Sequence, residues 1–326
     1  MEADVCEYLL PEGVGAAGVT AALAGHLRLE AGRARSVHRT FYDTFDGLLR
    51  AAGLVLVHQD RRLVLLDAAQ AEQAVADLPQ RPKRLFAADL PAGRLRELVT
   101  PVLDVRAVTP IARTRSRLLP LHVLDGQQKT VVRLEVEEAT ALNGRVGAPL
   151  RPRLRAAAVR GYDKALARVR HTLTGDLGLA TADESVRDEA VRAAGGTPAG
   201  ISSKLQLALH PDQRADTAAV ILLTTLLATI QQNLPGTLAD VDSEFLHDLR
   251  VAVRRTRSAQ RQLRRVFPPG PVARFRAEFR RLQQVTGPTR DLDVHLLELD
   301  DAPELDPLRE LLTARRALER RRMQRA

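Results

Sequence analysis

Arginine side chains recur at three- and four-residue intervals in the segment 244–290. This segment contains twelve arginines and three acidic residues, and its excess of nine positive charges equals the net charge of the whole 326-residue chain, +9. A guanidinium group forms paired, charge-assisted hydrogen bonds to phosphate oxygens, for which its planar shape is better suited than that of lysine. A positive field confined to one segment indicates a polyanionic partner.

A helix across this segment would carry most of its charge on one side. At about 100° per residue, seven basic or titratable side chains fall within an arc of about 100°: His247, Arg250, Arg254, Arg257, Arg261, Arg264 and Arg265. The opposite side, with Phe245, Leu249 and Leu263, is apolar. Like charges at these spacings repel by a few tenths of a kcal/mol per pair, and no acidic residue lies between Asp248 and Glu278. A solvated face in an arginine-rich protein is one explanation, and we favour a face that binds a linear polyanion.

Nucleic acid is the alternative polyanion. The chain has no Trp and three Tyr, none of them after Tyr162, so side chains on which bases stack are scarce in the basic half. Phe275 and Phe279 lie on the apolar side of a predicted helix, where we expect them in the core. The sequence therefore favours a phosphate polymer without bases.

The elements that must position these arginines are helical from about residue 212. An apolar stripe from Val220 to Leu234 predicts a first helix that ends at Pro235-Gly236. Further helices are predicted at 243–267, 272–285, 289–299 and from 307 to the last residue. The dense apolar part of the first helix is shorter than the about 20 residues that cross a bilayer, so we predict a buried helix of a soluble protein.

The first 160 residues have a different pattern. Short β-type runs at 54–57, 63–66 and 130–137 are separated by turn residues and by helical patterns at 14–29 and 95–103. This indicates an α+β domain on a mainly antiparallel sheet, followed by a helix at 154–173. The glycine-containing stretch that follows is typical of a linker. We therefore predict a first domain at 1–174, a linker at 175–211 and an all-α helical bundle at 212–326.

The composition excludes several classes of protein. Cys6 is the only cysteine, which excludes an internal disulfide framework and fits a reducing compartment. The acidic N-terminus lacks the apolar stretch of a secretory signal. We expect a cytoplasmic protein without a membrane partner.

The string His247-Asp-Leu-Arg-Val-Ala-Val-Arg-Arg-Thr-Arg257, followed by Gly287-Pro-Thr-Arg-Asp-Leu-Asp293, resembles the CHAD domain, the conserved-histidine α-helical domain. The resemblance implies a helical bundle of two similar four-helix halves that binds inorganic polyphosphate in a basic cavity. It places polyphosphate-binding residues at His247, Arg250, Arg254, Arg257, Arg280 and Arg290. Arg261 is added because it shares the helix face.

The chain ends within the first of the two halves that the CHAD resemblance implies. We therefore expect a half-built polyphosphate cavity, unless two chains form a homo-oligomer through the incomplete bundle or the natural protein is longer. Such a half-built cavity puts the affinity in question rather than the type of ligand.

The N-terminal part resembles the CYTH or triphosphate-tunnel family, which often precedes CHAD in bacterial chains. Its carriers are Phe41-Tyr-Asp-Thr-Phe-Asp46, Ala52-Gly-Leu54 and Arg160-Gly-Tyr-Asp-Lys164. The family hydrolyses triphosphates with a metal held by a Glu-x-Glu-x-Lys strand, where this chain has Ala3, Val5 and Glu7. Phosphoanhydride hydrolysis needs the metal to offset charge. The resemblance thus implies a degenerate domain without metal, cofactor or catalytic residue, and a metal-dependent triphosphatase or polyphosphatase is the alternative function.

A residual phosphate site is predicted on two strands of this domain. Arg113, Arg115 and Arg117 alternate onto one strand face, and Arg133 shares another face with Glu135 and Glu137. These side chains either line the polar interior of a partial barrel or point outward, with Val132, Leu134 and Val136 facing the core. The sequence leaves both arrangements open.

Overall fold

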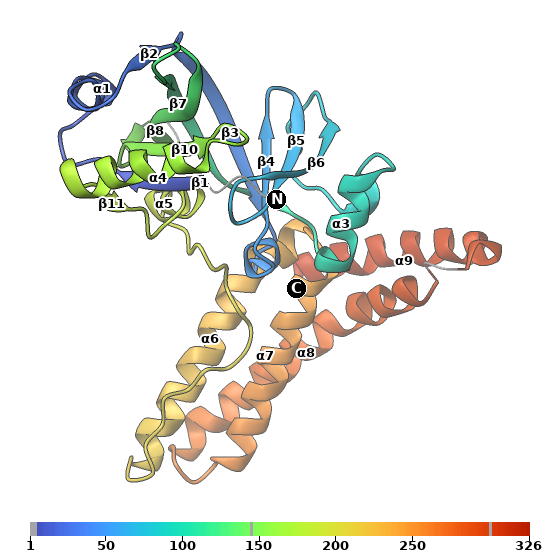
Figure 1. The fold of residues 1–326 in the computed structure, drawn as a ribbon. Helices are drawn as coiled ribbons and strands as arrows, with labels where there is room; N and C mark the ends of the chain where they lie inside the picture. Colours follow the sequence, from blue (N-terminus) through green and yellow to red (C-terminus); the bar gives the residue numbers. More distant parts are fainter. Residues whose placement is uncertain (1–4, 144–145, 300–301) are drawn as a thin grey trace. The chain divides into compact units, whose positions relative to one another are not determined.

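The chain divides after Gly200 into two units, Met1–Gly200 and Ile201–Ala326. The computed structural model, drawn in Figure 1, describes residues 5–143, 146–299 and 302–326. The first unit contains the strands and the second contains the long helices α6 to α9. The predicted fold class, a mainly antiparallel N-terminal domain followed by a helical one, is confirmed.

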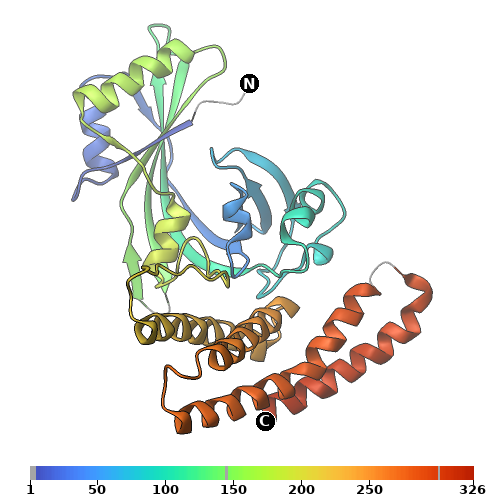
Figure 2. The same cartoon turned by 90° about the horizontal axis from the view of Figure 1, so that it is seen from below.

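The described strands of the first unit form one antiparallel sheet, in the order β11-β1-β10-β8-β7-β3-β4-β5-β6, with β2 paired to β7 and β9 paired to β8. Figure 2 shows how the long strands curve across the unit. The strands are β1 (Val5–Leu9), β2 (Leu29–Ala31), β3 (Arg35–Asp43), β4 (Val55–Gln59), β5 (Arg62–Leu66), β6 (Glu72–Asp77), β7 (Thr109–Leu124), β8 (Thr130–Asn143), β9 (Val146–Pro149), β10 (Arg153–Ala158) and β11 (Ala180–Thr181).

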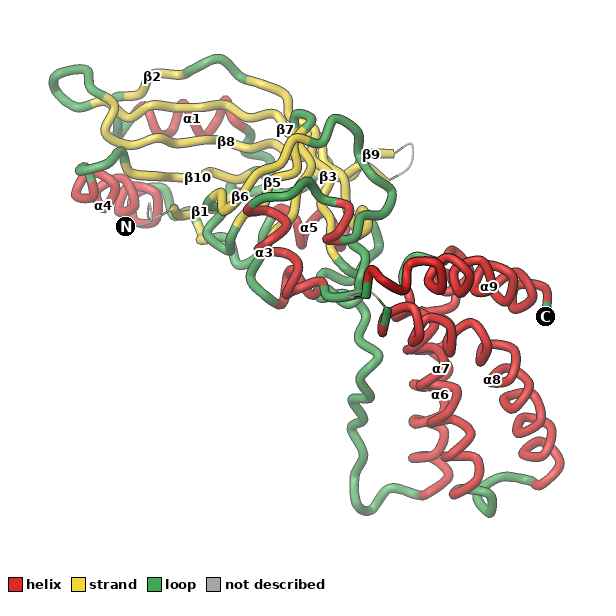
Figure 3. The backbone as a smooth tube through the Cα atoms, turned by 90° about the vertical axis from the view of Figure 1, so that its right-hand side faces the viewer, coloured by secondary structure: helices red, strands yellow, loops and turns green. Residues whose placement is uncertain are grey.

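One face of the sheet packs against α1 (Ala16–Ala24) and α4 (Asp163–His171). Successive side chains of a strand point to opposite faces, and Val132, Leu134 and Val136 of β8 are buried in this core. Figure 3 shows α1 and α4 beside the strands β8 and β10. Burial of these alternating apolar residues fixes the register of β8 against its neighbours.

The other face of the sheet holds α5 (Val186–Ala193). Val186, Ala190 and Val191 pack there in one core with Phe41 and Val57, and β11 pairs with β1. The prediction of a linker at 175–211 was therefore wrong in its first half, and the predicted end of the first domain at 174 moves to Gly200. The physical reason for both corrections is that α5 has apolar residues at helical spacing, which bury against the sheet and so make this stretch part of the first unit.

Two short helices complete the first unit. α2 (Leu48–Ala51) and α3 (Arg94–Leu103) contribute Leu49, Leu95 and Val99 to a core with β4, β5 and β6. The predicted helix at 154–173 was wrong over its first residues, because β10 runs to Ala158 and pairs with both β1 and β8.

The second unit consists of α6 (Ala215–Ala239), α7 (Ser243–Gln262), α8 (Pro269–Glu298) and α9 (Asp306–Arg325). Its core joins Leu226 and Ile230 of α6 to Leu249, Ala252 and Val253 of α7. These are the apolar residues opposite the arginines, so burial of this side turns the charged side of α7 away from α6.

Two helices continue past the residues at which the sequence predicts that they end. α6 continues through Pro235-Gly236 to Ala239, and Gly236 lies so close to α7 that an added Cβ would meet Phe245 Cδ1 at 2.2 Å. α8 continues through Gly287-Pro288. Arg250 donates to the Gln283 carbonyl oxygen and to Thr286 Oγ1, both at 2.9 Å, and so joins the turn before Pro288 to α7.

α6 is long and apolar enough to cross a membrane by length and composition, and 28% of its most apolar window is buried. Val220, Leu227, Leu234 and Leu238 are exposed. The prediction of a buried helix was therefore correct for the side that packs on α7 and wrong for the other side.

Candidate functional site

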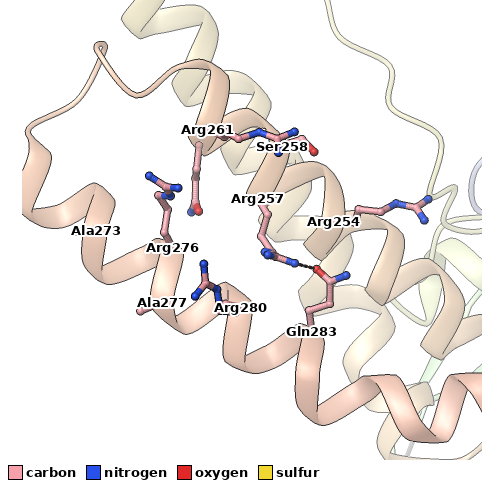
Figure 4. A pocket seen from close by; sticks show the side chains of 10 residues that line it. Arg254, Arg257, Ser258, Arg261, Ala273, Arg276, Ala277, Arg280 and Gln283 are labelled. Atoms are coloured by element: carbon pink, nitrogen blue, oxygen red, sulfur yellow. Dashed lines mark hydrogen bonds between the residues drawn. The ribbon is translucent and has the colours of Figure 1, made fainter.

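The helix α7 is fixed at its N-terminus by Asp242 and along its length by its apolar side. The Asp242 carboxylate accepts hydrogen bonds from the backbone N–H groups of Glu244 at 3.0 Å and Phe245 at 3.3 Å. Such a cap satisfies donors that the first turn leaves free. With Phe245 and Leu249 buried, the rotation of α7 is set: Arg257 points toward α8, whereas the Arg254 side chain extends away from α8 (Figure 4). Arg254, Arg257 and Arg261 all line the same cleft.

These three arginines line a cleft between α7 and α8, to which α8 contributes Arg276 and Arg280. The cleft has a volume of about 520 Å³. We call it the arginine cleft, and its full lining is Arg254, Arg257, Ser258, Gln260, Arg261, Ala273, Arg276, Ala277, Arg280 and Gln283. In Figure 4 the side chains of Arg257, Arg276 and Arg280 extend into the space between the two helices.

The lining of the arginine cleft carries five guanidinium groups and no carboxylate. Arg257 donates a hydrogen bond to the Gln283 side-chain oxygen, while Arg254, Arg261, Arg276 and Arg280 are exposed. No aromatic ring is among the lining residues. The cleft therefore offers many charged donors to an anion and no flat surface on which a base would stack.

Arg250 belongs to the same helix face and has a different role. Its Nη1 donates to the Gln283 carbonyl oxygen and to Thr286 Oγ1, both at 2.9 Å. Burial lowers the pKa of Arg250 from its ordinary value, and Asp291 opposes this effect. Arg250 therefore joins α7 to α8, and it does not line the cleft.

Arg290 is also engaged within the protein. Its Nη1 lies 3.2 Å from the Ser243 carbonyl oxygen and 3.3 Å from Glu244 Oε1, and the side chain is 15% exposed. His247 is half-buried and, like Arg290, lies outside the lining of the cleft.

The first unit has a smaller cavity, of about 230 Å³, on the α5 side of its sheet. Its charged lining residues are Glu7, Arg39, Glu72, Glu137, Arg155 and Arg187. Arg39 donates to Glu137, and Arg155 Nη2 lies 3.5 Å from Glu7 Oε1. Acids and bases thus balance one another here, in contrast to the arginine cleft.

Arg113, Arg115 and Arg117 do not reach this cavity. In the β7–β8 register Arg117 lies opposite Glu138, whereas Leu118 lies opposite Glu137, and directly opposed residues share a sheet face. The three arginines are exposed on the face opposite to the cavity. Of the two arrangements that the sequence left open, lining a barrel interior or pointing outward, these three arginines adopt the outward one. They therefore do not form a phosphate site together with Arg133.

Arg133 lies on the same face of β8 as Glu135 and Glu137, and its side chain is exposed. It is not part of the cavity lining. The structure therefore does not bring the four arginines of the predicted residual phosphate site together.

Asp43, within the Phe41–Asp46 string, has a structural role. Its carboxylate accepts from the backbone N–H of Leu49 at 2.9 Å and of Arg50 at 3.1 Å, and it forms a buried ion pair with Arg187 of α5. Burial raises the pKa of Asp43, an effect that Arg187 opposes. This carboxylate fixes α2 and α5 to the sheet.

Comparison with known proteins gives a family match within the helical unit and a structural similarity over a larger part of the chain. Residues 221–326 match the CHAD domain family. No curated protein matches the chain. Among solved structures, the chain is similar to a Hippeastrum protein that is described as having a dominant triphosphatase activity. The identity is 14% and the TM-score 0.37, and the match covers 60% of this chain and 97% of the other.

The CHAD segment, residues 221–326, contains all seven residues that we predicted to bind polyphosphate. The structure brings four of them, Arg254, Arg257, Arg261 and Arg280, to the arginine cleft. His247, Arg250 and Arg290 lie outside its lining. Arg264 and Arg265, which we placed on the same helix face, follow the end of α7 at Gln262.

Arg276 was not among the predicted residues. The four-residue interval between Arg276 and Arg280 would have placed both on one face of the predicted helix 272–285. Gln260 and Gln283 also line the cleft, and nothing in their sequence positions indicates this, because the facing of α7 and α8 is decided by packing.

Proposed function

We propose that the CHAD segment binds inorganic polyphosphate in the arginine cleft and does not hydrolyse it. The single observation that carries this proposal is the lining, in which two facing helices present five guanidinium groups and no carboxylate. The CHAD resemblance adds the class of ligand. Arg254, Arg257, Arg261, Arg276 and Arg280 are the proposed binding residues.

The arrangement suits a linear phosphate chain for a geometric reason. Each phosphate unit of such a chain carries charged oxygens that are not part of the chain itself, so the oxygens can be bound from two sides. Arg254, Arg257 and Arg261 approach from α7, and Arg276 and Arg280 approach from α8. Charge-assisted, bidentate hydrogen bonds from both rows would hold successive phosphates.

Polyphosphate binding should depend strongly on salt. By analogy with nucleic acid, a polymer of phosphates releases counterions when arginines bind it, and each phosphate contact steepens the fall of affinity with salt. Arg250 supports the site by joining α7 to Gln283 and Thr286 of α8, and Arg290 of α8 does so by bonding to Glu244 of α7. Both also contribute positive charge from outside the lining.

A titration of the full chain with long-chain polyphosphate at two salt concentrations tests the proposal. Replacing both Arg254 and Arg261 with Gln should weaken binding by about a hundredfold, since each charge-assisted hydrogen bond contributes about 1.5–3 kcal/mol. Arg255→Gln removes an exposed arginine of the same helix that does not line the cleft and serves as the control. Equal losses in the two variants would contradict a site in the cleft.

Nucleic acid is the alternative ligand of the arginine cleft. Phe275, which we predicted in the core, is 52% exposed, and it lines a different, apolar groove with Leu234 and Leu238. It is therefore not positioned to stack a base in the arginine cleft. Single-stranded RNA of matched charge should compete weakly with polyphosphate, and equal competition would indicate a general polyanion site.

Hydrolysis by the first unit is the alternative function, and the donor set there does not favour it. Ala3 lies outside the described residues, and of Val5 only the backbone is described. Glu7 lies near Arg153 and Arg155. Among the described residues no group of three or more His, Cys, Asp or Glu is placed to hold a metal ion. The residues present do not fit the metal of the CYTH resemblance, and we expect no phosphate release from tripolyphosphate with magnesium or manganese.

We also propose a location and an oligomeric state. We expect the protein to be cytoplasmic and to self-associate through the helical unit. The apolar side chains exposed on α6 support self-association: Leu227, Leu234 and Leu238. Light scattering of the full chain would detect the oligomer, and a monomer at all concentrations would contradict it.

A further inference from the structure

The outer part of the α7–α8 hairpin has only a thin core, in which Phe279 and Leu282 of α8 pack, half-buried, against the core of α6 and α7. None of the residues 260–285, which we call the hairpin tip, is buried. In the inner part of the same two helices Leu249, Ala252 and Val253 of α7 and Thr286 of α8 are buried. Regions with few buried apolar contacts open locally at low free-energy cost, so the tip is the least stabilised part of this helix pair.

The charges within and next to the tip oppose its closure. Arg257 and Arg261 lie four residues apart on α7, as do Arg276 and Arg280 on α8, and like charges at this interval destabilise a helix. The two rows also face one another across the arginine cleft. Arg257 with Gln283 is the one hydrogen bond that joins the two helices among the residues lining the cleft, all of which the structure describes.

We propose that the bound polyanion adds to this thin core and orders the hairpin tip, so that the site is a ligand-controlled conformational switch. This inference rests on the proposed function for its ligand, because it requires an anion between the two arginine rows. The phosphate chain reverses the sign of the interaction between the rows, since each row is attracted to the anion that lies between them.

A tip that opens by charge repulsion responds to mutation differently from a rigid site. If repulsion opens the tip in the free protein, removing charge from the cleft stabilises the tip while it destroys the binding site. A ligand shifts such an equilibrium only by its different affinity for the closed and open states. The same arginines therefore lower the stability of the free tip and provide its response to the ligand.

Amide hydrogen exchange of the full chain, measured by mass spectrometry with and without long-chain polyphosphate, tests this inference. At an ionic strength of about 0.01 M the screening length is about 30 Å, so the arginine rows repel fully. Polyphosphate should slow exchange in residues 260–285 by about tenfold or more. Exchange in the core of the first unit, for example in β8, should not change.

Two double variants separate the switch from simple binding. Arg276→Gln with Arg280→Gln removes one arginine row, and we expect slower exchange of the tip in the free protein and no response to polyphosphate. Arg255→Gln with Arg274→Gln removes the same number of charges from exposed positions outside the cleft lining. This matched control should keep both the fast exchange and the response.

The outcomes distinguish the inference from the proposed function. Polyphosphate that binds in the titration but leaves exchange of residues 260–285 unchanged would overturn the switch and leave the binding site. Faster or unchanged exchange in the free Arg276→Gln/Arg280→Gln protein would also overturn it. An absence of any binding would refute the proposed function and, with it, the role of the ligand in the switch.

Discussion

The arginines of α7 and α8 differ in function according to what their donors already bind. Arg250 is hydrogen-bonded to the Gln283 carbonyl oxygen and Thr286, and Arg290 is paired with Glu244. Arg254 and Arg261 are exposed in a cleft without carboxylates. The sequence alone gives these arginines equal weight, whereas the side-chain partners divide them into a structural pair, Arg250 and Arg290, and a binding set.

Arg276 provides the sharpest test at this scale, because sequence motifs did not point to it. We expect Arg276→Gln to weaken polyphosphate binding about tenfold, since one charge-assisted interaction contributes about 1.5–3 kcal/mol, and to reduce the slope of log affinity against log salt by about one. Titrations at several salt concentrations measure both. Arg274→Gln, an exposed arginine on the same helix outside the cleft, should change neither by a comparable amount.

At the scale of single elements, the sequence predicted those features that depend on local pattern. The apolar side of α7 and the strands β4, β5 and β8 follow from helical and alternating spacing. The ends of α6 and α8 did not follow from Pro235-Gly236 and Gly287-Pro288, because tertiary contacts decide whether such residues end a helix. Gly236 allows the close approach of Phe245, and Arg250 supports the turn before Pro288.

The candidate site was only partly predictable for the same reason. Arg254, Arg257, Arg261 and Arg280 were predicted, and the facing of α7 and α8, which makes a cleft of them, is a tertiary feature. The position of α5 on the sheet was missed because a short helix in a glycine-containing stretch has a weak local signal. Its Val186 and Val191 are buried only through contacts with distant strands.

Gly236 tests the packing of α6 on α7. Alanine favours a helix over glycine by about 1 kcal/mol, but its Cβ would lie 2.2 Å from Phe245 Cδ1, and overpacking costs about 1–3 kcal/mol. We therefore expect Gly236→Ala to lower the free energy of unfolding in urea. Gly270→Ala, at a helical glycine with nothing within 4 Å of an added Cβ, should leave it unchanged or slightly higher.

Arg316 tests the attachment of α9. Its guanidinium bonds to Asp240, with Nη2 2.7 Å from Oδ1, and to the buried Asp293. Asp240 keeps a second partner in Arg320, whereas the buried Asp293 would lose this ion pair, and breaking a buried pair costs about 3–5 kcal/mol. Arg316→Ala should lower the stability of the helical unit by this amount in urea unfolding followed by circular dichroism.

The neighbouring Arg315 is the control for this prediction. It is 60% exposed and pairs with Glu319 at 3.1 Å, and exposed pairs contribute about 0–1 kcal/mol. If Arg315→Ala lost as much stability as Arg316→Ala, then α9 would be sensitive to any arginine replacement. The loss in Arg316→Ala could then not be assigned to the buried ion pair with Asp293.

Over the whole molecule, the two units treat charge in opposite ways. In the first unit the arginines of the cavity have acidic partners, as Arg39 has Glu137 and Arg187 has Asp43. In the helical unit the positive excess of the chain lies between Glu244 and Arg290, and five of these arginines line one cleft. We therefore expect the helical unit to account for nearly all polyanion binding by the full chain.

Arginine footprinting of the full chain measures this most directly. The protein is treated with phenylglyoxal with and without long-chain polyphosphate, and the modified arginines are identified by mass spectrometry. We predict that polyphosphate protects Arg254, Arg261, Arg276 and Arg280 and leaves Arg255, Arg274 and the exposed arginines of β7 as reactive as before. Equal protection of the cleft and control arginines, or protection confined to the first unit, would contradict polyphosphate binding in the arginine cleft.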